Sequence, residues 1–115
     1  MNSVLITIKK LLGYGSDPTE FDPEIIVHIN SVLMDLSQLG VGPEDPASIS
    51  SELDTWEQTI GNINDYKAVE TYMYLRDKLL FDPPPSSAVV AEFAKQIEKL
   101  EWRLNAQAEL KKGGM

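Results

Sequence analysis

Cysteine is absent from this chain of 115 residues, and its absence excludes several kinds of chemistry. Without a thiol there is no disulfide, no thiolate zinc site, no cysteine nucleophile and no sulfur-based redox centre. A domain of this length buries roughly two thirds of the surface that its unfolded chain exposes, so it folds without such cross-links. We therefore expect residues 1–115 to form a single domain held together by an apolar core.

Long apolar runs are also missing, because polar residues interrupt the hydrophobic stretches every three or four positions. No segment is therefore expected to span a bilayer. No basic stretch precedes the first apolar residues, so we do not expect a signal peptide at the N-terminus.

Basic residues are absent from the middle of the chain. The net charge is -8, and from Leu11 to Tyr66 there is no Lys or Arg beside eleven acids: Asp17, Glu20, Asp22, Glu24, Asp35, Glu44, Asp45, Glu52, Asp54, Glu57 and Asp65. The remainder holds 7 acids and all 10 bases, a net charge of +3. This distribution argues against binding of a phosphate backbone through the middle of the sequence. The acidic segment forms either an ordinary solvated surface or a face that meets passing DNA or a basic protein.

Histidine occurs once, at His28, and this scarcity argues against catalysis. A hydrolytic triad has little support with one His and no nucleophile elbow. The Glu-x-x-His pairs of carboxylate-bridged metal sites are missing, and Glu52, Asp54 and Glu57 have the wrong spacing for a helical magnesium hydrolase. No phosphate-binding glycine loop is present. We expect neither an enzyme nor a bound metal or cofactor.

What the sequence does contain is helical patterning. Apolar residues recur at three and four positions from Val4 to Leu12, and Gly13 is placed to end this helix. Asp22-Pro23-Glu24 is a strong start signal, with Asp22 as the cap, for a second helix that closes at Gly40. The predicted fold is all-α, a small bundle of about four to five helices.

The segment 40–51 is rich in Gly, Pro and Ser, so it is predicted to be a long irregular loop that projects from the helical body. A short helix within 51–60 follows, with Ser51 or Asp54 as its cap and Trp56 as its anchor in the core. Asn64 or Asp65 is predicted to cap a third long helix, whose apolar stripe is Tyr66, Val69, Tyr72, Met73, Leu79 and Leu80.

A proline corner, LLFDPPPSSAVV (Leu79–Val90), separates that helix from the last one. Three prolines lack N–H groups and force the incoming helix to stop near Asp82, and Ser86 and Ser87 are predicted to cap the outgoing helix. The last helix is long, with one narrow apolar seam. Trp102 lies off this seam, so it either widens the buried face or contacts another chain. Residues 106–115 are expected to form a flexible tail.

Two segments together are similar to a known family: HINSVLMDLSQLGVGP (His28–Pro43) and KAVETYMYLRDKLLFDPPPSSAV (Lys67–Val89), followed by EWRLN (Glu101–Asn105). They resemble the head-tail connector, or adaptor, proteins of long-tailed double-stranded DNA bacteriophages and prophages of Gram-positive bacteria. The resemblance covers nearly the full length. A third proline, Pro85, and the short Gly-Gly-Met end depart from the family pattern.

The resemblance implies a structural virion protein, monomeric alone, that assembles as a dodecameric ring beneath the portal protein. The ring would extend the DNA channel toward a tail or stopper protein at the head-tail junction, after assembly in the host cytoplasm. Candidate interface residues are then Trp102, Arg103, Lys111 and Lys112. Candidate channel-lining residues are Glu44, Asp45 and Glu52, whose charge would let double-stranded DNA pass without specific binding.

The residues leave two competing interpretations. The first is a small acidic helical binding module, a DNA mimic or an inhibitor of a DNA-binding protein. The second is a magnesium-dependent hydrolase that uses Asp54 and Glu57.

Overall fold

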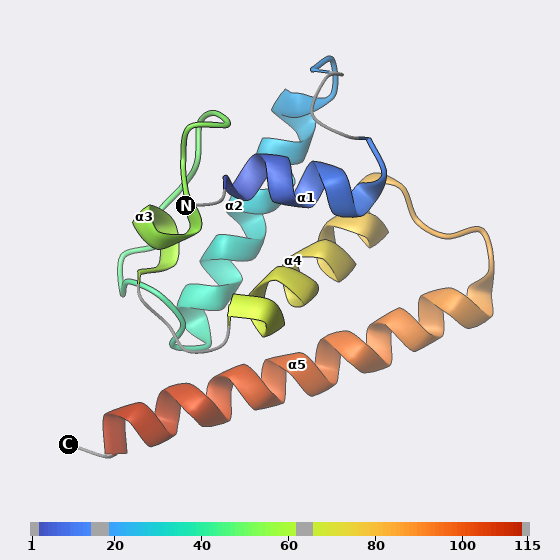
Figure 1. Cartoon of the computed structure of the whole chain (residues 1–115). Coiled ribbons are helices and arrows are strands. Elements are labelled where there is room, and N and C mark those ends of the chain that lie inside the picture. The colour runs from blue at the N-terminus through green and yellow to red at the C-terminus, as the bar shows by residue number, and fades with distance from the viewer. Residues whose placement is uncertain (1–2, 15–18, 62–65, 114–115) are drawn as a thin grey trace.

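The computed structural model describes residues 3–14, 19–61 and 66–113, and these form five helices. They are α1 (Val4–Leu12), α2 (Asp22–Gln38), α3 (Trp56–Ile60), α4 (Tyr66–Phe81) and α5 (Ser87–Gly113), shown in Figure 1. No strand occurs in these ranges, where the only β-type contact is an isolated bridge between Ser3 and Thr55. The predicted all-α bundle, with its long irregular loop and long last helix, is confirmed.

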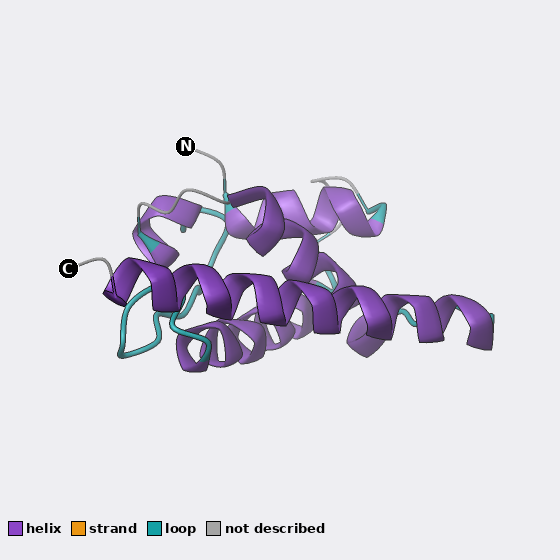
Figure 2. Cartoon of the chain, turned by 90° about the horizontal axis from the view of Figure 1, so that it is seen from below, coloured by secondary structure: helices purple, strands orange, loops and turns teal. Residues whose placement is uncertain are grey.

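Helix α4 lies at the centre of the bundle. It packs against α1, α2 and α5, while α1 and α2 also contact each other. The molecule is flat, with extents of 45 × 35 × 19 Å, and α5 runs along its length. The N-terminal part of α5 extends past the other helices (Figure 2). No helix in the described ranges is long and apolar enough to cross a membrane.

One apolar core joins all five helices. Its largest fully buried hydrophobic side chains come from α1, α2 and α4, whereas α5 contributes one fully buried residue, Leu104. The members from the first two helices are Val4, Leu5, Ile8, Leu12, Ile25, Ile29, Val32, Leu33 and Leu36. The predicted stripes of these two helices therefore face the core, except for Leu11, which is 46% exposed.

Helix α1 ends as predicted, at Gly13, which adopts a left-handed conformation with φ of +94°. The start of α2 differs from the prediction. Asp22 does not cap the helix but is its first residue, and its carboxylate lies 2.9 Å from the ammonium group of Lys9. Lys9 is almost fully buried, and a buried cation needs a counter-charge. Because the Asp22 carboxylate pairs with Lys9, it does not cap the first turn of α2.

The cap of α3 is Thr55 rather than Ser51 or Asp54. Thr55 and Gln58 form a reciprocal capping box, so the helix starts only at Trp56. The Asp54 carboxylate instead accepts hydrogen bonds from the backbone N–H groups of Ser50 and Ser51, and so holds the preceding turn. The Trp56 anchor is confirmed: its side chain is buried and its indole N–H donates to Thr7 Oγ1. The predicted caps Asn64 and Asp65 lie outside the described residues.

The proline corner has the predicted form, except that Ser87 is the first residue of α5 and not its cap. Helix α4 ends at Phe81, and the Ser86 hydroxyl accepts a hydrogen bond from the Val89 N–H at the start of α5. The ring of Phe81 packs edge-on against Tyr14, Phe21 and His28. This cluster fixes the end of α4 against α1 and α2.

One residue of the predicted α4 stripe was misplaced. Leu80 is 51% exposed, whereas Asp77, which no pattern marked as core, is fully buried. Positions 77 and 81 lie one above the other on a helix, and position 80 is turned about 100° away. Because the aromatic cluster holds Phe81, Asp77 faces inward and Leu80 faces the solvent.

Candidate interaction surfaces

Helix α5 attaches to the rest of the bundle by one narrow seam. Leu104 is its only fully buried residue among those described, while Ile97 and Leu100 are partly buried against the core. Nearer the N-terminal end of α5, the ring of Phe93 lies 6.3 Å from the ring of Tyr74 on α4. Most of the surface of α5 therefore stays open to solvent.

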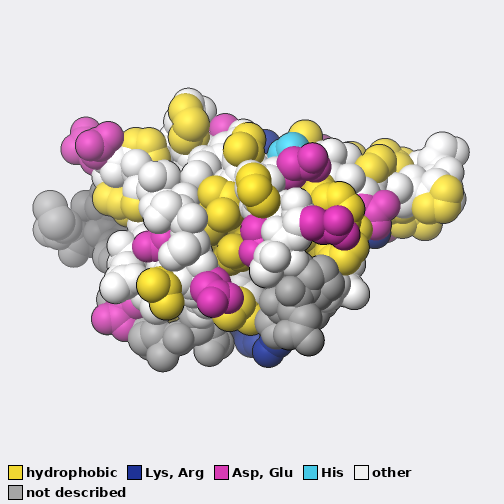
Figure 3. All heavy atoms as spheres, turned by 90° about the horizontal axis from the view of Figure 1, so that it is seen from above, with side chains coloured by type: hydrophobic (Ala, Val, Ile, Leu, Met, Phe, Trp, Pro, Cys, Tyr) yellow, Lys and Arg dark blue, Asp and Glu magenta, His cyan; other side chains and the backbone are white. Residues whose placement is uncertain are grey.

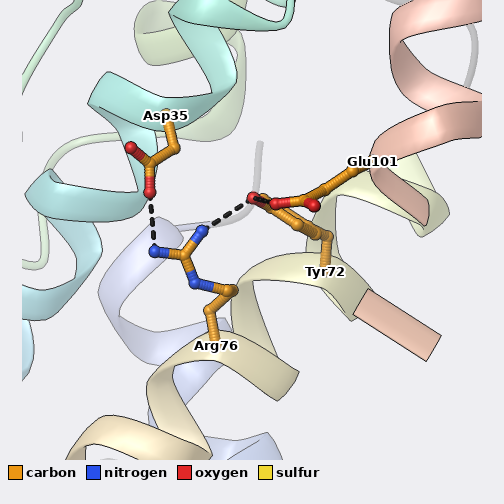
Figure 4. A network of polar contacts seen from close by, with 4 residues as sticks. All are labelled: Asp35, Tyr72, Arg76 and Glu101. Atoms are coloured by element: carbon orange, nitrogen blue, oxygen red, sulfur yellow. Dashed lines mark hydrogen bonds and ion pairs between the residues drawn. The ribbon is translucent and has the colours of Figure 1, made fainter. Parts of the chain in front are cut away.

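A chain of polar contacts crosses this seam and joins three helices (Figure 4). Arg76 on α4 donates to Asp35 on α2 at 2.6 Å and to the Tyr72 hydroxyl at 2.7 Å. The Tyr72 hydroxyl in turn donates to the Glu101 carboxylate on α5 at 2.8 Å. We call these four residues the inter-helix network.

Two members of the inter-helix network, Tyr72 and Arg76, have raised pKa values. Burial and the hydrogen bond to Glu101 raise the pKa of Tyr72 to about 12, so its phenol keeps the proton that it donates. Burial disfavours the charged form of Arg76, but the hydrogen bonds and charge interactions with Asp35 and Tyr72 together outweigh it, and the pKa of the guanidinium is raised. The network is thus a fixed clamp between α2, α4 and α5.

The second half of α5 also lies close to the end of α2. The Asn105 amide donates to the carbonyl oxygen of Leu39 at 3.2 Å. Gly40 has a φ of +90°, and a Cβ placed on it would lie 2.9 Å from the Cβ of Ala108. Gly40 is therefore required both by its backbone conformation and by the approach of α5.

The predicted interface residues lie on α5. Trp102 is 75% exposed, which excludes the interpretation that it widens the buried face of this chain. Arg103 is exposed beside it. Lys111 and Lys112 belong to the last turns of α5, which runs to Gly113, and their side chains lie outside the described residues. That this end of the chain frays stays a prediction.

The predicted channel-lining residues lie in the segment between α2 and α3. Glu44, Asp45 and Glu52 are all exposed. The loop that carries the first two does not project freely, because Ser37 donates to the carbonyl oxygens of Pro43 and Glu44. Further along the loop, the side chain of Asn30 bonds both the N–H and the carbonyl of Ile49. The loop is therefore held against α2 within the single chain.

The structure places these two groups on different elements. The predicted interface residues lie on α5, C-terminal to Glu101 of the inter-helix network. The predicted channel-lining acids lie in the segment that comes after the C-terminal end of α2. The residues that sequence reasoning missed are those of the network itself. One signal in the sequence could have indicated the network. Arg76 lies within the apolar stripe of its helix, four residues after Tyr72, and a basic side chain in such a position needs polar partners.

Metal binding finds no support in the described part of the chain, where no group of three His, Asp or Glu side chains is close enough to hold an ion. His28 is half-buried, and its ring lies 6.3 Å from that of Phe81. It takes part in the aromatic cluster of the proline corner.

The fold defines a class of protein, a small all-α bundle, and its exposed candidate residues lie on two different elements. The chain belongs to the phage connector protein family, which matches residues 4–111. The resemblance to phage head-tail connectors is thereby confirmed, and membership implies a place at the head-tail junction with portal and tail proteins as partners. No curated protein and no solved structure matches the chain.

Proposed function

We propose that the chain is the subunit of a dodecameric ring that assembles under the portal, extends the DNA channel and joins the filled head to a tail or stopper protein. Membership of the phage connector family supports the connector role. The observation that carries the ring is the pair of unlike faces: α4 lies between α2 and α5, so their outer surfaces point in different directions. A ring needs two different complementary surfaces on each subunit.

In this proposal the end of α5, with Lys111 and Lys112, contacts the portal protein. Trp102 and Arg103 also contact other chains, since an exposed Trp beside a cation is typical of an interface anchor. Glu44, Asp45 and Glu52 line the channel, where their negative charge repels the DNA phosphates and lets the duplex slide. Their exposure is compatible with that position.

The role requires assembly and no catalysis, in agreement with a structural family. The acidic middle of the chain favours a second candidate, a module that mimics DNA on the basic site of another protein. A DNA mimic would not explain why Trp102 on α5 is exposed. Assembly as a subunit explains both faces.

Native mass spectrometry of the full chain with purified portal protein separates the two candidates. We expect a closed ring of copies bound to the portal. A chain that stays monomeric beside the portal would contradict the proposal and favour the DNA mimic. A matched pair of variants locates the contact: Lys111→Ala with Lys112→Ala should weaken portal binding about tenfold, since each lost ion pair costs up to about 1 kcal/mol. Lys67→Ala, at an exposed site on α4, should not.

A further inference from the structure

We draw no further inference here: the strongest candidate, the exposed apolar patch of Val27 and Met34 on α2, on a molecule whose surface shows acidic side chains among hydrophobic ones (Figure 3), carries nothing because nothing in the structure shows what covers it.

Discussion

Asp77 shows what a single residue contributes when the surrounding helices fix its position. Its side chain is fully buried on α4, and neither carboxylate oxygen has a hydrogen-bond donor. Burial raises the pKa of this carboxyl to about 8, although the nearby Arg76 opposes the shift. At neutral pH the folded chain therefore holds a proton that the unfolded chain releases near pH 4.

The free energy of unfolding should therefore depend on pH. Because the folded-state pKa is raised, the unfolded state binds fewer protons between about pH 4 and pH 8, and stability falls as the pH rises through that window. Asp77→Asn cannot titrate. We expect its stability relative to the parent chain to increase by up to roughly 1.4 kcal/mol per pH unit from pH 5 to pH 7.

Urea unfolding followed by circular dichroism at pH 5, 6 and 7 measures this difference. The exposed Asp45→Asn serves as the control and should show no such trend. A constant offset between Asp77→Asn and the parent chain at all three pH values would mean that Asp77 titrates normally.

At the scale of elements, the feature that decides the architecture is the placement of α5. The helix shares only a narrow apolar seam with the core, so the inter-helix network and the close approach at Gly40 hold much of it. Two glycines with nearly the same backbone conformation separate these effects. Gly13 has a φ of +94° and open space around it, while Gly40 has a φ of +90° and faces Ala108.

We expect Gly13→Ala to cost about 1 kcal/mol for its left-handed conformation alone. Gly40→Ala should cost a further 1–3 kcal/mol or so, because its Cβ would overlap Ala108 and push α5 outward. Urea unfolding gives both values, and limited proteolysis of α5 reports the displacement. The double variant with Ala108→Gly should recover part of the loss. Equal costs at the two glycines would show that α5 does not press on Gly40.

At the scale of the whole molecule, acidic and basic residues are separated along the chain. All bases lie outside the stretch from Leu11 to Tyr66, and the exposed acids Glu44, Asp45 and Glu52 lie within it. A surface of this kind repels a phosphate backbone, and the repulsion is strongest at low salt, where screening is weakest.

We expect no retention of double-stranded DNA by the native chain in a mobility assay at physiological salt. Reversing the charges with Glu44→Lys, Asp45→Lys and Glu52→Lys should create binding at protein concentrations on the order of 10 µM, as for other non-specific binders. The neutral set Glu44→Gln, Asp45→Asn and Glu52→Gln separates lost repulsion from gained attraction and should bind weakly or not at all. Retention by the native chain would argue against a channel lining.

The features that could be read from the chain are local ones. The stop at Gly13, the proline corner and the helical stripes depend on residues within one or two turns of each other, so backbone sterics and hydrophobic periodicity are enough to predict them. The exposed position of Trp102 was one of two readings that its spacing allowed. The family resemblance, confirmed over residues 4–111, also came from contiguous segments.

What the tertiary structure alone decided involves residues far apart in the sequence. The Asp22 carboxylate pairs with Lys9 and does not cap α2. Arg76 donates to both Asp35 and Tyr72, and Tyr72 donates to Glu101. A buried charge needs a partner of opposite charge or a hydrogen-bond partner, and the packing of distant segments decides which residue that is. A local sequence pattern does not contain this information. The sequence by itself predicted an all-α bundle of about four to five helices, the distribution of its charge and its family. The packing around α4 determined which sides of α2 and α5 are exposed, because exposure depends on how the helices pack against one another.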